Sequence, residues 1–445
     1  MHMKNVIFTN EKHIMEEYIP PKKEKPIDVN IVVNPNIKYQ KHLGFGGALT
    51  DAACISFNYL PEIIKEIYLE AYFSEEGLNY NLLRYPLGSC DFSDHSYHYL
   101  NDDNLDNLSI ECDKDRIAMY KRIADIQKDL TVFAVPWTPP SFMKDTNAMC
   151  HGGKLKPEYY DLYSKMLLKS VDLLRKEGLN IKVLNTQNEP LAKQVWESCI
   201  YTGLEESDFV SHYLMKNQSL YDLNDLSYGV WDHNRDVLIK RIQETFSGDL
   251  KPENVSFVCF HWYSNQDFEQ LDKIHKLYPN LHLVMTEGCV ELLLDKNKEN
   301  SIGTFAHAER YAHQMINDFN HYCEGYIDWN LSLDSQGGPN HVGNFCEAPV
   351  MISKDGDMKL MYSFHAIAHF SRYIVPGAYR IQSSSDNSDI ELVSYENPDK
   401  SLVSVILNRS EVTHTINNPY EEGLSLELSP HTIYTVVYKK IETLN

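Results

Sequence analysis

Two glutamates in this sequence stand where a pair of carboxyl groups could act on one chemical bond. Glu189 lies in the tripeptide Asn188-Glu189-Pro190, and Glu287 follows the apolar run LHLVMT. Glycoside hydrolysis needs such a pair, because one carboxyl group donates a proton to the leaving oxygen while the other attacks the anomeric carbon or activates water. Each position alone is weak evidence, since many such residues merely end a strand in a turn. Together they predict a site that cleaves sugar bonds.

The neighbours of the two glutamates predict a role for each. The amide of Asn188 could hold a sugar 2-hydroxyl, a contact that strengthens in the transition state, and would leave Glu189 close to the glycosidic oxygen. Glu287 has Thr286 as its only polar neighbour in the strand, and Tyr263 is the nearest candidate to orient it. We therefore predict that Glu189 is the acid/base and Glu287 the nucleophile.

Eight short apolar segments, each followed by a helical pattern, must position these residues. Such runs are expected of strands that are buried on both faces. The segments are residues 43–47, 80–88, 130–137, 181–189, 226–232, 255–263, 281–287 and 324–333. Eight alternations of strand and helix over about 330 residues favour an α/β fold with a (β/α)₈ TIM barrel.

A doubly wound open sheet is the alternative fold. The glycines of Gly44-Phe45-Gly46-Gly47 do not have the spacing of a dinucleotide fingerprint, which argues against it. A tight turn or close packing is the simpler explanation of that cluster.

Barrel active sites form at the C-terminal ends of the strands. Those ends carry Arg84, Trp137, Asn188, Glu189, Asp232, His261, Trp262, Tyr263, Glu287, Asp328, Trp329 and Asn330. Strands four and seven of the ring carry the two glutamates, so both are expected at one narrow mouth. Most tryptophans are largely buried, but three at strand ends fit stacking on the apolar face of a sugar ring.

Two helical patterns make detailed predictions. Thr202 followed by Glu205 predicts a capping box at the start of a helix. The segment 61–77 predicts an amphipathic helix that ends at Gly77. Its expected apolar stripe consists of Ile63, Ile64, Ile67, Tyr68 and Ala71.

A second domain is predicted from the change of pattern near residue 378, where short alternating β segments replace the strand–helix alternation. These segments predict a small antiparallel β-sandwich. The strand-like run 28–35 is a candidate to join it, because chain termini often lie close together. The expected domains are an N-terminal segment 1–41 of the β-domain, a catalytic barrel 42–375 and a C-terminal β-domain 376–445.

Composition limits the partners. The net charge of −22 disfavours nucleic acid and anionic lipid and favours a neutral substrate. No apolar stretch is long enough to span a membrane. The first 20 residues carry charges throughout and show no signal peptide, so we expect a cytoplasmic protein.

The chain offers no clear metal or disulfide pattern. Its nine cysteines are an odd number without a C-x-x-C pair, and its histidine-rich pieces lack metal-ligand spacing. The neighbours Cys150 and His151 do not make a nucleophilic dyad by adjacency alone. We expect reduced cysteines, no metal and no cofactor.

Several motifs, in this order along the chain, resemble glycoside hydrolase family 30, and most closely its glucosylceramidase and β-glucosidase branch. The resemblance runs from about residue 40 to the end of the chain. The motifs are GFGGALTDAA (44–53), YFSEEGLNYNLLRYPLGSCDFS (72–93), PWTPPSFMK (136–144), QNEP (187–190), HWY (261–263), TEGCV (286–290), DWNLSLDSQGGPN (328–340) and LNRS (407–410).

The resemblance implies a retaining β-glycosidase with a barrel and a side β-domain built from both termini. It implies the same two catalytic residues, Glu189 and Glu287, with Arg84 and His261 as supporting residues. The residues expected to hold the sugar or line the cleft are Asp91, Trp137, Asn188, Tyr263, Trp329 and Asn344.

The sequence departs from the glucosylceramidase pattern in two respects. That pattern has Trp after GGPN, whereas His341 follows Asn340 here. The position is expected near the cleft rim and leaves the aglycone preference open. The secretory leader and paired N-terminal cysteines of the lysosomal enzyme are also absent, which favours a soluble glucoside over a membrane-bound ceramide glycoside.

Three functional hypotheses follow. The first is an exo-acting retaining β-glucosidase that works by double displacement on a small-molecule or oligosaccharide β-glycoside. The second is another activity of the same family: endo-β-1,6-glucanase, xylanase, β-fucosidase or β-xylosidase. The third is a glycan-binding protein without catalysis, against which the retention of both glutamates argues.

Overall fold

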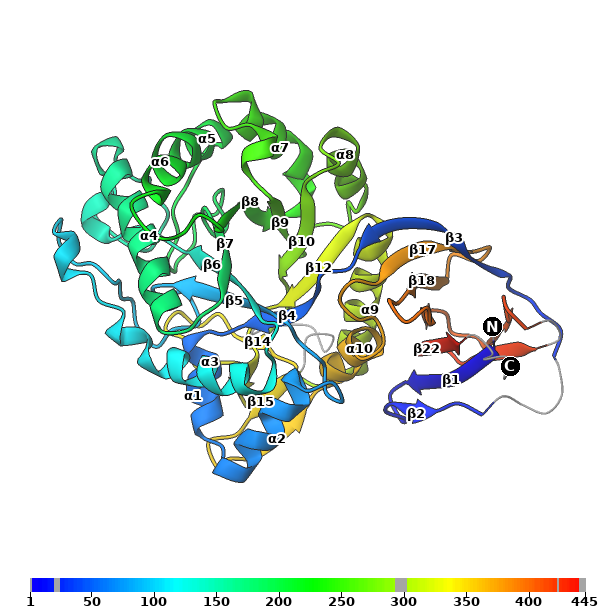
Figure 1. Cartoon of the computed structure of the whole chain (residues 1–445). Coiled ribbons are helices and arrows are strands. Elements are labelled where there is room, and N and C mark those ends of the chain that lie inside the picture. Colours follow the sequence, from blue (N-terminus) through cyan, green and yellow to red (C-terminus); the bar gives the residue numbers. More distant parts are fainter. Residues whose placement is uncertain (1, 20–24, 293–301, 422–423, 440–445) are drawn as a thin grey trace.

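A ring of eight parallel strands forms the centre of the larger domain (Figure 1). The computed structural model describes residues 2–19, 25–292, 302–421 and 424–439. The ring closes in the order β10-β12-β4-β5-β6-β7-β8-β9. The strands are β4 Gly44–Ala48, β5 Leu82–Leu87, β6 Thr131–Pro136, β7 Ile181–Asn185, β8 Ser227–Asn234, β9 Phe257–His261, β10 His282–Glu287 and β12 Cys323–Asp328. All eight predicted segments supply a strand, and the predicted TIM barrel is confirmed.

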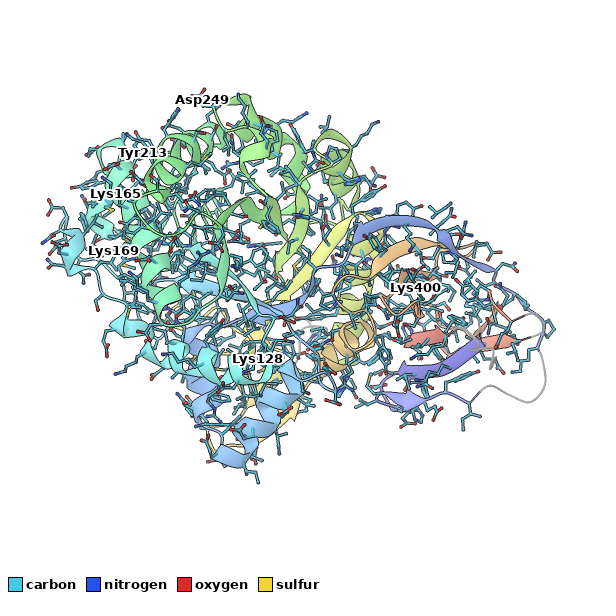
Figure 2. All side chains as sticks on the ribbon, in the orientation of Figure 1. Lys128, Lys165, Lys169, Tyr213, Asp249 and Lys400 are labelled. Carbon is cyan, nitrogen blue, oxygen red and sulfur yellow. The ribbon has the colours of Figure 1, made fainter. Side chains whose placement is uncertain are left out.

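The barrel strands are apolar on both faces because each lies between the barrel interior and a helix. Figure 2 shows that side chains occupy the space inside the ring which the ribbons leave open. One interior layer consists of Leu82, Phe133, Val183, Cys259, Val284 and Ile327. The barrel is therefore a packed core, and its chemistry is confined to the strand ends and loops.

Helices surround the ring (Figure 1). They are α1 Asp51–Asn58, α2 Glu62–Phe73, α3 Lys114–Ile126, α4 Tyr160–Lys176, α5 Gly203–Phe209, α6 Met215–Gln218, α7 Leu238–Ser247, α8 Glu269–Leu277, α9 Phe305–Asn320 and α10 Tyr362–Ser371. A π-helical turn, Val210–Leu214, joins α5 to α6. The predicted capping box of Thr202 and Glu205 opens α5 and is confirmed.

Helix α2 buries Tyr68 of the predicted stripe but exposes Ile63 and Ile67. Ile63 is 73% exposed and Ile67 50% exposed, whereas Tyr68 and Tyr72 are buried. The helix ends at Phe73, before the predicted stop at Gly77. Tyr68 packs against Phe57 of α1, and Tyr72 packs against Phe364 of α10. The helix buries this side because aromatic side chains have more apolar surface to bury than isoleucines.

The glycines of β4 allow neighbouring elements to approach closely. A Cβ atom at Gly46 would lie 2.0 Å from the carbonyl oxygen of Leu82, and one at Gly47 would lie 2.7 Å from the Leu331 side chain. Gly44 has φ +139°, a conformation that other residues rarely adopt. The structure thus supports close packing as the explanation of this glycine cluster.

An antiparallel β-domain packs beside the barrel against α9 and α10, and both chain ends lie in it (Figure 1). Its main sheet has the order β2-β1-β22-β19-β18-β17-β3, and a hairpin of β20 and β21 completes it. The strands are β1 His2–Thr9, β2 Glu16–Glu17, β3 Ile31–Lys41, β17 Tyr379–Ser385, β18 Ile390–Glu396, β19 Leu402–Asn408, β20 His414–Asn417, β21 Ser425–Leu428 and β22 Thr432–Lys439. The predicted side domain from both termini is confirmed.

Two small sheets extend the barrel mouth. One pairs β11 Val290–Glu291 with β14 Cys346–Glu347, and the other has the order β13-β15-β16 with β13 Ser332–Asp334, β15 Val350–Ile352 and β16 Met358–Leu360. The first sheet ties the segment after Glu287 to the loop that follows β13. None of the helices described is long and apolar enough to cross a membrane. All nine cysteines are free, and seven of them are buried.

Candidate active site

A cavity of about 300 Å³ opens at the C-terminal ends of the barrel strands. Its lining is Asp91, Trp137, Asn188, Glu189, Leu191, Ala192, Gln194, Trp196, His233, Asn234, Tyr263, Glu287, Glu291, Trp329, Asn344 and Cys346. Both glutamates and all six residues predicted to hold the sugar or line the cleft are among them. The two predicted supporting residues, Arg84 and His261, are fully buried next to it.

The two glutamates reach the cavity from different kinds of backbone. Glu287 is the last residue of β10. Glu189 lies four residues beyond the end of β7, with φ +45°, and its N–H donates to the carbonyl oxygen of Asp232 at 2.9 Å. An oxygen of each carboxyl group lies within 4.8 Å of the other and of a ring nitrogen of His261. The backbone strain at Glu189 is of the kind that functional sites retain.

Arg84 in β5 connects the two sides of the cavity. Its guanidinium donates to Glu287 Oε2, to Asn188 Oδ1 at 2.6 Å and to Asp232 Oδ2 at 2.8 Å. Its central carbon also lies 4.8 Å from the ring centre of Trp137. The fixed fork of an arginine suits this arrangement, since it can hold several acceptors in one plane. Arg84 therefore holds Glu287 and Asn188, the neighbour of Glu189, in fixed positions relative to each other.

His261 lies between two carboxylates. Its Nε2 is 3.2 Å from Asp232 Oδ1, and its Nδ1 is 3.5 Å from Glu189 Oε1. Although burial favours the neutral ring, Glu287, Asp232 and Glu189 raise the pKa of His261 to about 9. The imidazole consequently holds a proton next to Glu189.

The two cavity glutamates have opposite pKa shifts in the ligand-free site. Burial opposes a charge on Glu189, but His261 and His233 hold the pKa of Glu189 at about 2. Burial raises the pKa of Glu287, and Glu189 and Asp232 add to the rise against the effect of His261 and Arg84. These shifts favour a proton on His261 over a proton on Glu189.

Two stacked tryptophans and an amide–carboxyl contact belong to the cavity lining. Trp137 and Trp329 stack with ring centres 5.4 Å apart. Asn344 Nδ2 donates to Asp91 Oδ2 at 2.8 Å. Burial and the nearby Glu287 raise the pKa of Asp91 well above its ordinary value. An aromatic wall beside a polar pair offers the apolar and hydroxyl contacts that one sugar ring needs.

Tyr263 does not orient Glu287 as predicted. Its hydroxyl contacts Cys289 Sγ at 3.4 Å, while the direct partner of Glu287 is Arg84. Tyr263 still lines the cavity. Tyr263 lies two residues beyond the end of β9, where the direction of a side chain cannot be predicted from the sequence alone.

Sequence reasoning missed the residues that act through others. Asp232 is buried, accepts from Arg84 and Thr286, and faces His261; although burial opposes it, these partners hold the pKa of Asp232 well below its ordinary value. Gln194 donates its side-chain amide to Glu189 Oε2 at 3.3 Å. Asp232 did carry a signal, its place at a strand end, whereas Gln194 lies in a loop that carried none.

Glu189, His261 and Glu287 are also close enough to share a cation, because one ligand atom from each lies within 4.8 Å of the other two. Arg84 and the raised pKa of His261 already place positive charge at this point. The donor set is therefore better suited to moving a proton than to holding a metal.

Replacing Arg84 by methionine is expected to lower the free energy of unfolding by about 3–5 kcal/mol, because it leaves Asp232 and Glu287 buried without their cation. Arg84 lowers the pKa of Asp232. The stabilisation of the folded protein by this pair is therefore present at pH values above the ordinary pKa of aspartate and is lost as the pH falls below it. Urea unfolding should show a gap between wild type and Arg84→Met that narrows below about pH 4.

The half-buried Arg122, which pairs with Glu62 and Glu66 at the surface, offers a matched control. Arg122→Met should change the free energy of unfolding by less than about 1 kcal/mol. Equal effects of the two substitutions would contradict the bridging role of Arg84.

Comparison with known families gives two matches that cover most of the chain. Residues 42–374 match the family model described as the glycosyl hydrolase family 30 TIM-barrel domain. Residues 377–436 match the one described as the glycosyl hydrolase family 30 beta sandwich domain.

Individual relatives and structures agree with these matches. The chain is 31% identical to the lysosomal acid glucosylceramidase of Mus musculus over 441 residues, covering 92% of this chain and 83% of the mouse protein. It is 25% identical to the endo-1,6-beta-D-glucanase BGN16.3 of Trichoderma harzianum over 400 residues, or 83% of this chain and 78% of the fungal one. The crystal structure of SrfJ from Salmonella typhimurium superposes with a TM-score of 0.91 at 31% identity, covering 98% of this chain and 99% of SrfJ.

Proposed function

The chain belongs to glycosyl hydrolase family 30 and is a glycoside hydrolase, and on that premise we propose that it is an exo-acting retaining β-glucosidase. Its carbohydrate substrate would be a terminal β-linked glucose on a small or apolar aglycone. The observation that carries this proposal is the closeness of Glu189 and Glu287 in the lining of a small cavity.

The separation of the carboxyl groups supports retention. Retaining enzymes hold the two groups about 5–5.5 Å apart, whereas inverting enzymes leave about 6.5–9.5 Å for a water molecule. The nearest oxygens of Glu189 and Glu287 lie within 4.8 Å. In the proposed reaction the carboxylate attacks the anomeric carbon, the leaving oxygen takes a proton, and water then cleaves the glycosyl ester.

Contacts support Glu287 as the nucleophile. Arg84 binds it directly, which favours the ionised carboxylate for the attack and stabilises the same carboxylate when water displaces it from the anomeric carbon. Its raised pKa in the empty cavity results from burial and from two neighbouring carboxylates. Arg84 lowers the pKa of Glu287 and stays beside it when a proton moves to Glu189, which favours the ionised Glu287.

The proton that Glu189 needs as an acid is available from His261. The pKa shifts favour a charged pair, with the proton on the imidazole, whose Nδ1 lies 3.5 Å from Glu189 Oε1. A bound sugar excludes water, and a dry medium penalises two charged groups more than two neutral ones. Substrate binding therefore favours transfer of the proton from His261 to Glu189, which can then donate it to the leaving oxygen.

The size of the cavity supports exo action. A volume of about 300 Å³ lies at the small end of the range for ligand pockets, about 300–1,000 Å³. Trp137 and Trp329 close one side of it, and Asp91 with Asn344 offers polar partners for hydroxyl groups. One terminal sugar fits these contacts better than the interior of a polymer chain.

Three residues shortly after Glu189 in the chain add an apolar part to the cavity lining. Leu191, 49% exposed, lies there with Ala192 and the half-buried Trp196. The leaving group must sit on the side of the acid, so this surface supports an apolar or aromatic aglycone. The resemblance to a fungal endo-1,6-glucanase keeps β-1,6-glucan as the second candidate substrate.

The proposal is tested with aryl β-glucoside, β-xyloside and β-fucoside together with β-1,6-glucan and xylan. We expect the aryl β-glucoside to be cleaved fastest, with β-glucose as the first anomer seen by proton NMR. Rapid shortening of β-1,6-glucan without action on the aryl glucoside would reject exo action, and α-glucose as the first product would reject retention. Glu287→Gln protein from the same preparation controls for contaminating activity.

A further inference from the structure

A bulge near the end of β8 precedes two polar residues of the cavity lining. The register between β8 and β9 shifts between Trp231 and His233, which leaves Asp232 as the extra residue. Trp231 and Asp232 have φ +78° and +54°, values that residues other than glycine rarely adopt. Bulges often lie beside active sites, where they change the direction of the side chains that follow. The side chains that follow here, His233 and Asn234, both line the cavity.

His233 lies next to Glu189, the residue assigned as the acid. The carbonyl oxygen of Asp232, the residue before His233, accepts from the N–H of Glu189 at 2.9 Å. The ring of His233 stacks on that of His261 with centres 6.3 Å apart, and His261 faces Glu189. His233 and Glu189 also interact electrostatically. Since the acid protonates the leaving oxygen, His233 lies on the leaving-group side of the cavity.

Neither ring nitrogen of His233 has a hydrogen-bond partner in the part of the chain that the structure describes. Its Nδ1 is buried without one, and the ring lies against the rings of Trp231 and His261. Burial lowers the pKa of His233 against the effect of Glu189, which favours the neutral ring. A neutral imidazole has one donor and one acceptor nitrogen, so it can bond a hydroxyl group, which also does both.

Two amide side chains of the same lining each have one end held by the protein. Gln194 Nε2 donates to Glu189 Oε2 at 3.3 Å, and its Oε1 has no partner among the described residues. Asn234 Oδ1 accepts from the N–H of Tyr263 at 3.0 Å, and its Nδ2 likewise has no described partner. These residues therefore add one free acceptor and one free donor to the imidazole of His233.

Apolar residues of the same lining can cover the face of a ring. Leu191 and Trp196 belong to the segment that carries Gln194. A wholly apolar aglycone would use these two residues but would take the nearby polar groups out of water without giving them partners, which costs free energy. A ring with an apolar face and a hydroxylated edge satisfies both kinds of group.

We propose that His233, assisted by Gln194 and Asn234, binds a hydroxyl group of the leaving group, so that the enzyme prefers a hydroxylated ring as its aglycone. His233 is thereby a specificity-determining residue. The assignment rests on the proposed function in taking Glu189 as the acid, and it narrows the small or apolar aglycone to a ring with a hydroxylated edge. A second sugar and a phenol that carries a further hydroxyl share this chemistry.

The test compares aryl β-glucosides that differ by one hydroxyl group. Phenyl β-glucoside is the reference, and 3-hydroxyphenyl and 4-hydroxyphenyl β-glucosides are the probes. Their leaving groups are nearly equal in acidity, so all three need nearly the same help from Glu189. For the wild type we expect kcat/KM of the better probe to exceed that of the reference about three- to tenfold, the effect of one hydrogen bond.

His233→Phe keeps a ring without nitrogens, so the ratio of probe to reference should fall to about one. The ratio is used because an effect of the substitution on Glu189 alters probe and reference alike. His282→Phe is the matched control, since His282 begins β10 and Glu287 ends it, and it should keep the wild-type ratio. A wild-type ratio of about one for both probes would overturn the proposal, as would an unchanged ratio in His233→Phe.

Disaccharides distinguish a sugar from a phenol as the hydroxylated ring. The β-1,4- and β-1,6-linked glucose disaccharides are compared with cyclohexyl β-glucoside, whose leaving group is a ring of similar size without further hydroxyls. A preference for a disaccharide that falls in His233→Phe assigns the contact to a sugar. A preference confined to the hydroxyphenyl probes assigns it to a phenol.

Binding separates this inference from the proposed function. Calorimetric titration of Glu287→Gln protein with probe and reference gives the same comparison as a ratio of Kd values, without turnover. If β-xylosides or β-fucosides are cleaved in place of glucosides, the same aglycones are compared on that sugar, and a preference for the hydroxylated ring stands while the β-glucosidase proposal fails. Fast cleavage of aryl β-glucosides with equal kcat/KM and equal Kd for probe and reference would refute the hydroxyl contact alone.

Discussion

Glu287→Gln is expected to lower the turnover of an aryl β-glucoside by about 10⁴-fold or more while the protein stays folded. An amide cannot form the glycosyl ester, and the substitution removes one of the two anionic partners of Arg84. The loss should appear in kcat with every leaving group, because both good and poor ones need the attack. Steady-state kinetics and circular dichroism measure the two parts of the prediction.

A matched variant places the same change at the other end of the barrel. Glu324 in β12 pairs with His282, away from the cavity, so Glu324→Gln should stay within a few-fold of wild-type activity. Removal of the side chain in Glu287→Gly should allow azide to take the place of the carboxylate and yield α-glucosyl azide. A Glu287→Gln enzyme with more than a tenth of normal turnover would show that another residue is the nucleophile.

Glu189→Ala is expected to lower kcat/KM by about 10²–10⁴-fold for glucosides with poor leaving groups and much less for a dinitrophenyl glucoside. A leaving group that departs as a stable anion does not need the proton of Glu189. Azide should accelerate the second step of this variant and give β-glucosyl azide, since it attacks the glycosyl-enzyme from the side of Glu189. Equal losses for both kinds of leaving group would contradict the acid role.

The pH profile gives an independent check on Glu189. The proton it uses is held by His261, whose pKa is raised to about 9, so kcat/KM of the wild type should fall only as the pH rises toward that value. In Glu189→Ala this alkaline limb should vanish, because no proton is delivered. Measurements from pH 6 to pH 10 with one poor and one good leaving group would test it.

Most of the barrel could be predicted because its strands are buried on both faces and are read as short apolar runs between helices. The two glutamates also followed from the sequence, since the strand count placed both at one mouth. Helix α2 shows the limit. Its isoleucines and tyrosines lie on adjoining faces, and only the contacts of Tyr68 and Tyr72 with Phe57 and Phe364 decide which face is buried.

The role of Asp232, which contacts other residues and not the substrate, could not be predicted from the sequence for a different reason. Asp232 matters because Arg84, Thr286 and His261 converge on it from three strands. A single sequence does not show which residues contact Asp232, so this role becomes visible only in the three-dimensional structure.

The pairing of the two ends of the chain has a consequence for how the protein is made. Strand β22, residues 432–439, lies between β1 and β19, so β1 binds a strand that is synthesised only after the whole barrel. Until β22 has been synthesised, β1 lacks this neighbour and exposes an open strand edge. A truncation before residue 432 should therefore be more prone to aggregation during expression than its intact barrel would indicate.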